Sequence, residues 1–156
     1  MNRNLLSHLW LGLLVLLLVS GCAWNASAQS MGNQPSATLY KRLGGYDAIA
    51  AVTDEFITRA ANDKQLSRFL VGLSTESKKR LRQLIVDQLC EAAGGPCIYT
   101  GRSTKAAHAG LGITESDWQL TVKHLAAILD KFKVPEKEKN DFLALASSLK
   151  GDIVEK

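Results

Sequence analysis

The chain has 156 residues, of which 22% are charged, and a formal net charge of +4. Its dense basic cluster, Lys78-Lys79-Arg80 with Arg82, lacks the interleaved aromatic and polar residues of a nucleic-acid surface, so we expect a solvated helix face and no nucleic-acid partner. The length predicts one small domain behind an N-terminal segment of different composition.

The first residues have the pattern of an export signal. A short basic start is followed by a continuous apolar run from Leu9 to Val19. A run of this length is too short to cross a bilayer as a helix, which needs about 20 residues, but it is typical of a signal-peptide core. We therefore expect residues 1–28 to be a signal peptide and the protein to be exported to the periplasm.

Two cleavage sites compete within this segment. Val19-Ser20-Gly21-Cys22 resembles the lipobox of bacterial lipoproteins, in which Cys22 would be lipidated, whereas Ala26-Ser27-Ala28 is a small-x-small site for cleavage after Ala28. We favour the lipobox, and Ala23 beside it gives no inner-membrane retention signal, so a lipid anchor in the outer membrane is expected. Residues 29–37 are polar and without apolar periodicity, which indicates a flexible tether.

From residue 38 to residue 156 the pattern is helical, because apolar residues recur three and four positions apart. Gly44-Gly45 and Gly94-Gly95-Pro96 are helix-ending signals, Thr114 begins a capping-box-like start, and Pro135 stands at a first-turn position. The predicted elements are 39–43, 46–61, a short turn at 64–70, a long helix from Ser74 or Thr75 to Ala93, a short helix at His108, 114–133 and 135–149.

The most informative residue is His108. It lies on the short predicted helix, entered through Thr100-Gly101 and left through Gly110-Leu111-Gly112, with apolar helices before and after. Such a helix can present one imidazole to a flat, apolar cofactor. The other histidine of the predicted domain, His124, lies in the middle of a helix, where a solvated or locally bonded role is expected.

Taken together, these segments resemble the truncated haemoglobins, the two-over-two globins, and specifically their first group. The resemblance covers about residues 39–154 and depends on a few motifs. These are Leu39-Tyr40-x-x-Leu43-Gly44-Gly45, Phe56, Arg68-Phe69-Leu70, Gly94-Gly95-Pro96-x-x-Tyr99-Thr100-Gly101, Lys105-x-x-His108-x-Gly110-x-Gly112-Ile113-Thr114, and Val134-Pro135.

The resemblance implies an all-α, two-over-two helical sandwich that holds haem b non-covalently, with His108 as the protein ligand to iron. Covalent attachment is not indicated, because the sequence has no Cys-x-x-Cys-His motif. Lys105 and Arg102 could pair with the haem propionates or simply be solvated. The expected cofactor-binding residues are His108, Phe56, Ile57, Phe69, Leu70, Leu81, Ile85, Gln88, Lys105, Leu111, Ile113, Trp118 and Val122.

The distal side departs from the usual pattern of the group. Ile57 stands where relatives usually have a tyrosine, and Leu81 and Ile85 fall where the long helix should face the iron. Gln88 is the one polar side chain on that stripe, and Gln83 is a second candidate if the register shifts. We therefore expect an apolar distal pocket with weak retention of oxygen.

Cys90 and Cys97 flank the double glycine. On a helical wheel Cys90 points away from the Leu81, Ile85 and Gln88 stripe. A disulfide in an oxidising compartment and two separate reduced cysteines are equally compatible with the sequence.

The leading functional hypothesis is a haem protein that binds oxygen, nitric oxide or carbon monoxide for transport, storage, sensing or detoxification. A haem-dependent redox enzyme, peroxidase-like or nitric-oxide-detoxifying, with an unknown electron donor, ranks lower because Gln88 is the one distal polar group. Two further alternatives are a zinc site built from Cys90, Cys97, His108 and His124, and a helical lipoprotein without a cofactor.

Overall fold

The computed structural model describes residues 37–156, and the expected signal peptide, Cys22 anchor and tether up to residue 36 lie outside the described residues. The described part forms one compact unit. Its elements are α1 (Leu39–Arg42), α2 (Tyr46–Asn62), the 3-10 helix η1 (Ser67–Phe69), α3 (Thr75–Ala92), α4 (Thr104–His108), α5 (Glu115–Lys131), α6 (Glu136–Ser148) and α7 (Lys150–Ile153). No strand occurs between residues 37 and 156, so the predicted all-α class is confirmed.

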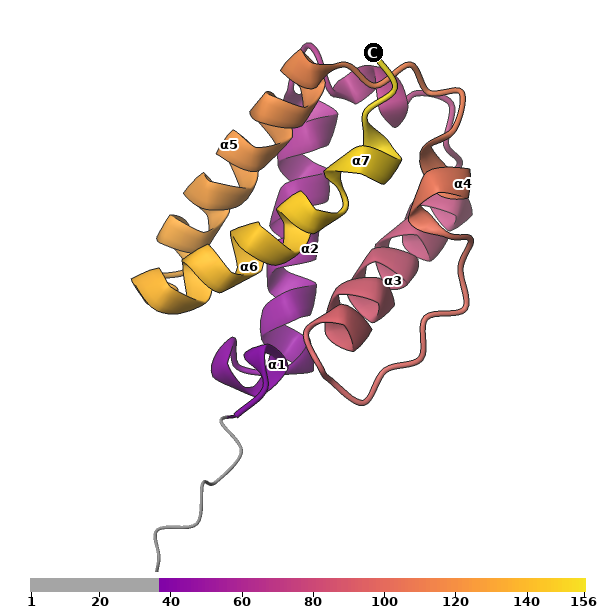
Figure 1. The fold of residues 1–156 in the computed structure, drawn as a ribbon. Coiled ribbons are helices and arrows are strands. Elements are labelled where there is room, and N and C mark those ends of the chain that lie inside the picture. Colours follow the sequence, from indigo (N-terminus) through magenta and orange to yellow (C-terminus); the bar gives the residue numbers. More distant parts are fainter. Residues whose placement is uncertain (1–36) are drawn as a thin grey trace, which may run out of the picture. The chain divides into compact units, whose positions relative to one another are not determined.

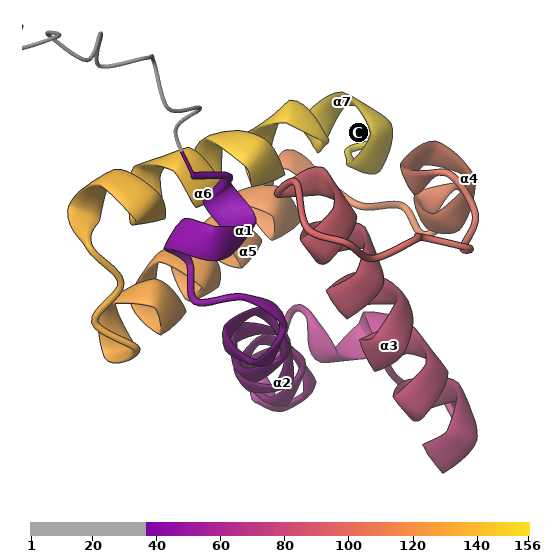
Figure 2. The same ribbon diagram turned by 90° about the horizontal axis from the view of Figure 1, so that it is seen from below.

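Two antiparallel helix pairs build the domain (Figure 1). Helices α2 and α3 form one pair, α5 and α6 form the other, and α2 contacts both α3 and α5. The view in Figure 2 places the short α4 beside α7, away from the centre of either pair. This is the two-over-two arrangement that the sequence predicts. None of the helices between residues 37 and 156 is long and apolar enough to span a membrane.

Local sequence signals set most helix boundaries. The side chain of Ser74 accepts a hydrogen bond from the Ser77 amide at the start of α3. Thr114 and Asp117 form a complete capping box at the start of α5, as predicted. Pro135 is the N-cap of α6 and lies one position before the expected first turn, because its ψ of 148° is extended rather than helical. The last predicted helix continues past Leu149 into a separate turn, α7, which the sequence does not predict.

The corner after α3 is tight and depends on glycine. Gly94 has φ 79°, which a residue with a side chain adopts only with strain. A Cβ added at Gly95 would lie 2.5 Å from Cδ2 of Tyr40 and 2.7 Å from Sγ of Cys90. The double glycine therefore allows the chain to turn directly against α1 and the end of α3.

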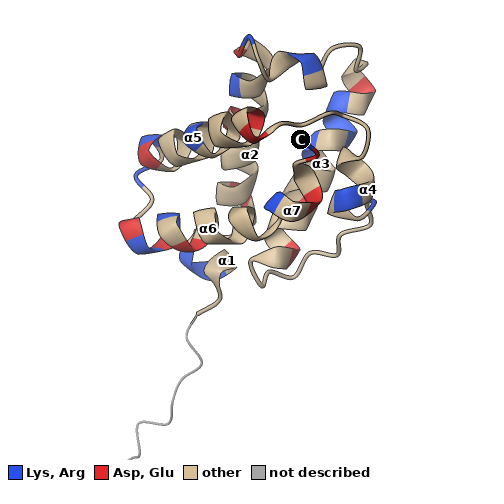
Figure 3. Ribbon diagram, turned by 45° about the horizontal axis from the view of Figure 1, so that its top comes forward, with Lys and Arg blue, Asp and Glu red and all other residues tan. Residues whose placement is uncertain are grey.

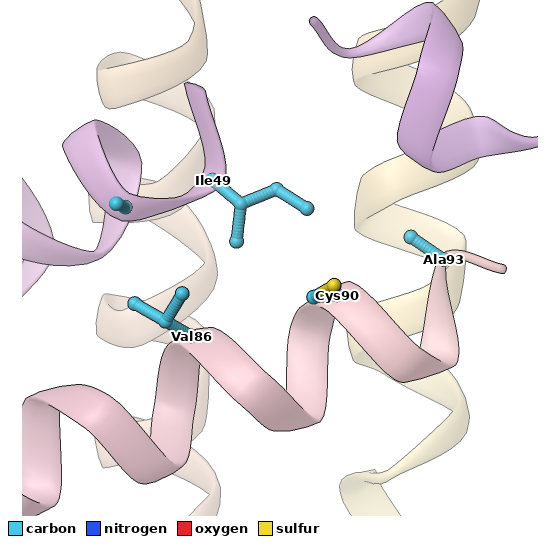
Figure 4. Close-up of a cluster of buried hydrophobic side chains, with 5 residues drawn as sticks. Ile49, Val86, Cys90 and Ala93 are labelled. Carbon is cyan, nitrogen blue, oxygen red and sulfur yellow. The ribbon is translucent and has the colours of Figure 1, made fainter. Parts of the chain in front are cut away.

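One hydrophobic core lies between α2 and α3. Ile49, Val86, Cys90 and Ala93 pack together there (Figure 4). Cys90 is fully buried in this cluster and is joined to Cys97 by a disulfide, with Cα atoms 5.8 Å apart. Of the two alternatives compatible with the sequence, the structure therefore contains the disulfide.

A second core joins α2 to the other helix pair. Its buried members are Val52, Ile128, Leu129 and Phe142. These residues come from α2, α5 and α6, so the cluster holds the two pairs of the sandwich together.

Basic and acidic residues are distributed along the helices (Figure 3). Lys78, Lys79 and Arg80 are exposed on the first turns of α3, and Arg82 makes a bidentate ion pair with Asp54 of α2. At the opposite end, Arg42 binds both Glu138 and Asp141 and so ties α1 to α6.

Candidate functional site

A cavity of about 720 Å³ opens between the helix pairs. This volume is within the range of about 300 to 1,000 Å³ that small-molecule and cofactor sites have. Its walls come from α2, η1, α3, the 99–102 segment, α4, α5, α6 and α7. The cavity therefore lies where all the main elements of the sandwich converge.

Most of the expected cofactor-binding residues line this cavity. They are His108, Phe56, Phe69, Leu70, Leu81, Ile85, Gln88, Leu111, Ile113 and Trp118. Arg102, the expected propionate partner, also lines it.

Ile57, Lys105 and Val122 do not line the cavity. Consecutive helical residues point about 100° apart, and their neighbours Phe56, Thr104 and Thr121 occupy the cavity faces of the three helices. The side chain of Lys105 is exposed on the outer side of α4. The spacing locates the right helices, and each of these three residues lies one position from a residue that lines the cavity.

Several cavity residues are absent from the sequence prediction. Leu89 follows Ile85 by one turn on the same stripe of α3, and that spacing could have identified it. From the C-terminal part come Phe142, Ala146, Leu149 and Ile153. Their spacing marks one helical face, but the sequence does not show whether that face covers the cavity or only the core.

The imidazole of His108 has a fixed orientation. His108 is the last residue of α4, is half-buried and lines the cavity. Its Nδ1 lies 2.7 Å from the carbonyl oxygen of Thr104. Because a carbonyl can only accept, Nδ1 carries the hydrogen, and Nε2 keeps its lone pair available for a metal. Binding of the second ring nitrogen to a backbone carbonyl is typical of histidines that ligate metals.

The α3 wall of the cavity is apolar at its centre. Leu81, Leu84 and Ile85 line it. The amide of Gln88 donates to Oγ1 of Thr104 at 2.9 Å, so this side chain bridges α3 to the start of α4. Gln83 lies outside the cavity and donates to the hydroxyl of Tyr46 and to Asp87.

The cavity wall also contains polar side chains. Arg80, Tyr99 and Arg102 contribute to it. The Tyr99 hydroxyl donates to the Arg102 carbonyl at 2.7 Å and so fixes the segment that leads from the disulfide to α4. Two guanidinium groups in the wall of a largely apolar cavity suit a ligand that carries carboxylates.

Asp117 is a buried carboxylate on another wall of the cavity, with 1% of its surface exposed. It accepts hydrogen bonds from Thr114, Gln65 and Arg68. Burial raises the pKa of the Asp117 carboxyl, but the bonds from the Thr114 amide, the Gln65 amide and the Thr114 hydroxyl, with the charge of Arg68, outweigh it and hold the pKa below its usual value. Asp117 therefore joins the 65–68 segment to the start of α5.

The second histidine takes a different role. Nε2 of His124 lies 3.1 Å from Oδ2 of Asp63, outside the cavity. The Asp63 carboxylate also accepts the backbone amides of Gln65 and Leu66, which hold its pKa below the usual value together with His124. The local bonding expected for His124 agrees with this contact.

The zinc alternative is wrong. Cys90 and Cys97 are bonded to each other and offer no thiolate to a metal. Among residues 37–156, no group of three or more His, Cys, Asp or Glu side chains is placed to hold a metal ion.

An all-helical two-over-two sandwich with one histidine presented to a large apolar cavity defines a globin. The match of residues 38–155 to the bacterial-like globin family model agrees with this class. The chain is 35% identical over 117 residues to the group 1 truncated haemoglobin GlbN of Mycolicibacterium paratuberculosis, covering 75% of this chain and 84% of the relative. It belongs to the bacterial-like globins and, within them, to the group 1 truncated haemoglobins.

Solved structures agree on the fold. Truncated haemoglobin from Tetrahymena pyriformis, in its Fe(III) form, has a TM-score of 0.70 and 24% identity, with 77% of this chain and 100% of that chain covered. The 2/2 haemoglobin of Synechococcus, which carries covalently attached haem, has a TM-score of 0.69 and 24% identity over 77% of this chain and 100% of that one. Haem with its iron is the cofactor of this family.

Replacing the buried Asp117 carboxylate tests its role in holding the cavity wall. Asp117→Asn should lower the free energy of unfolding by about 1 to 3 kcal/mol at neutral pH, because charge-assisted hydrogen bonds are lost. The folded-state pKa of Asp117 is depressed. Its contribution is therefore complete above the unfolded pKa, near 3.9, and disappears as the pH falls through the folded value.

Urea unfolding from pH 7 to pH 2.5 measures this effect. The difference between wild type and Asp117→Asn should shrink below about pH 4. Asp152→Asn, an exposed acidic position on α7, is the matched control and should leave the unfolding free energy unchanged. If the difference in unfolding free energy between wild type and Asp117→Asn stayed constant from pH 7 to pH 2.5, the stabilising role of the ionised Asp117 carboxylate would be contradicted.

Proposed function

We propose that this chain holds haem b non-covalently in the cavity, with Nε2 of His108 as the protein ligand to iron, and binds a diatomic gas on the opposite face. The observation that carries the proposal is the His108 imidazole, whose Nδ1 is tied to the Thr104 carbonyl inside a large apolar cavity. When bound, haem supplies an iron site for oxygen, nitric oxide or carbon monoxide.

The residues present fit this cofactor. Leu81 and Ile85 supply an apolar surface on α3, while Trp118 and Ile113 close the cavity from the side of α5. Arg80 and Arg102 line the cavity, where they would pair with the two propionate carboxylates. The apolar walls exclude water from the remainder of the cofactor.

A haem-dependent redox enzyme, peroxidase-like or nitric-oxide-detoxifying and fed by an unidentified electron donor, is the second candidate. Such chemistry needs an acid–base or charge-stabilising group beside the gas. Gln88 is bonded to Thr104, and the buried Asp117 carboxylate is already bonded to Thr114, Gln65 and Arg68. These contacts favour gas binding over catalysis.

His108→Ala should abolish haem retention, since no other side chain replaces the iron ligand. The measurement is the Soret band of the reconstituted protein and its shift on addition of carbon monoxide. His124→Gln is the control, because His124 lies outside the cavity, and this variant should keep both the band and the shift. If His108→Ala kept a Soret band that shifts with carbon monoxide, the assignment of His108 as the iron ligand would be refuted. If the wild-type protein had no Soret band, a helical protein without haem would be favoured.

Adding a donor to the α3 wall should slow oxygen release. Ile85→Gln places an amide in the apolar stretch and should lower the oxygen dissociation rate about tenfold, the effect of one hydrogen bond of about 1.4 kcal/mol. Carbon monoxide dissociation should change less, because that ligand depends less on a donor. Stopped-flow spectroscopy measures both rates.

Ala92→Gln, an exposed position near the end of the same helix, should leave both rates unchanged. A wild-type oxygen dissociation rate as slow as that of relatives with a distal tyrosine and glutamine would contradict the proposed apolar pocket.

We further propose that the chain is exported and that Cys22 carries a lipid anchor on the periplasmic side of the outer membrane. The apolar run from Leu9 to Val19 and the disulfide between Cys90 and Cys97 support this, because disulfides persist in oxidising compartments. Mass spectrometry of the chain from the cell envelope should find a lipidated N-terminus at Cys22, which Cys22→Ser removes. A start at Gln29 would instead support ordinary signal cleavage, and an unprocessed cytoplasmic chain would contradict export.

A further inference from the structure

The helix that carries His108 is too short to hold its own orientation. It spans the five residues Thr104–His108. Isolated helices below about 12 residues are marginal in water, so a single turn depends on its tertiary contacts. Its principal neighbour is α7 at the other end of the chain, beside which it lies in Figures 1 and 2.

Glu155 makes the most specific contact between the C-terminal segment and the exit of this helix. Its Oε1 accepts the amide of Gly110 at 2.5 Å, and its Oε2 accepts the amide of Gly112 at 2.6 Å. Both oxygens of one carboxylate are thus bonded to the loop that begins two residues after His108. Hydrogen bonds to an ionised acceptor are roughly twice as strong as those between neutral groups.

The backbone of the loop is shaped for this carboxylate. Gly110 has φ 82° and Gly112 has φ 64°, conformations that residues with a side chain rarely adopt. A Cβ added at Gly110 would meet nothing within 4 Å, and one at Gly112 would meet only Nζ of Lys156 at 3.9 Å. The two glycines are therefore required for backbone direction rather than for space. Amides turned to one side in this way form a concave anion-binding site.

Backbone pairing holds the carboxylate in place. The amides of Glu155 and Lys156 donate to the carbonyl of Ile113 at 2.9 and 3.3 Å, and the Glu115 amide donates to the Lys156 carbonyl at 3.1 Å. Within the loop, the Leu111 amide donates to the His108 carbonyl at 3.2 Å. A continuous series of bonds therefore runs from the C-terminal residues to the backbone of the histidine.

We propose that Glu155 is a positioning residue for the iron ligand. Its carboxylate fixes Gly110 and Gly112, which fixes the end of α4 and so the direction of the His108 imidazole. The inference rests on the proposed function of His108. Outer-shell groups that orient metal ligands typically change metal retention by about ten- to a hundredfold, and the exposed position of Glu155 places it at the lower end.

The test compares Glu155→Ala and Glu155→Gln with Asp152→Ala, which removes one acidic side chain three positions away on α7. Three properties are measured: the rate of haem transfer to an excess of an apo-globin acceptor, the iron–histidine stretching frequency of the ferrous unliganded protein, and hydrogen exchange of the Gly110 and Gly112 amides in the haem-free chain. Glu155→Ala should lose haem about tenfold faster, shift the stretching band and expose both amides to exchange. Glu155→Gln should show a smaller change in each, and Asp152→Ala should match the wild type.

Equal haem loss and equal amide exchange in Glu155→Ala and the wild type would overturn the proposal. Faster amide exchange with unchanged haem loss and stretching frequency would overturn it too, since Glu155 would then order the loop without directing the histidine. If Asp152→Ala lost haem as fast as Glu155→Ala, the effect would depend on negative charge alone, and the proposal would also be overturned. If the wild-type chain takes up no haem, the proposed function itself fails, an outcome distinct from the others because every variant would then share it.

Discussion

The hydrogen bond between Nδ1 of His108 and the Thr104 carbonyl is the interaction on which the candidate site depends, because it orients the imidazole in the cavity. It fixes which ring nitrogen is free and aims that nitrogen from the last residue of a helix one turn long. A histidine that could rotate would be a poor iron ligand, because each orientation that misses the metal lowers its effective affinity. In the proposed haem site, the disulfide and the C-terminal residues would help to hold this side chain through the segments on either side of α4.

The disulfide contributes through the segment that precedes α4. Cys90 is buried in the core between α2 and α3, so the disulfide ties Cys97 to this core. The chain from Cys97 to Ser103 has no regular secondary structure, yet Tyr99, Thr100 and Arg102 line the cavity. Closing this loop covalently reduces the number of conformations available to it. The disulfide therefore restricts the segment that precedes α4, while Glu155 binds the loop that follows it.

How much of the fold and of the site the sequence predicts depends on how far apart along the chain the interacting residues lie. Caps, glycine corners and the stripe on α3 are local, and the sequence located them within one or two positions, including the capping box at Thr114. Ile57 and Val122 lie one position from the cavity-lining residues Phe56 and Thr121, and one helical position turns a side chain by about 100°. The C-terminal contributions were missed because nothing local in Leu149, Ile153 or Glu155 shows which distant segment they meet.

Several polar side chains form hydrogen bonds with the segments that flank α4. Gln88, which lines the cavity from α3, donates to Thr104 at the start of α4. The Tyr99 hydroxyl holds the Arg102 carbonyl just before that helix, and Glu155 holds the two amides just after it. The Tyr99 hydroxyl has a single hydrogen and could donate elsewhere only by breaking its present bond, at a cost of about 0.5 to 1.5 kcal/mol, whereas the bond to Thr104 uses one of the two amide hydrogens of Gln88. In the proposed haem site, Gln88 and Tyr99 would therefore support the helix that carries the iron ligand, while Leu81, Leu84 and Ile85 would supply an apolar wall on α3.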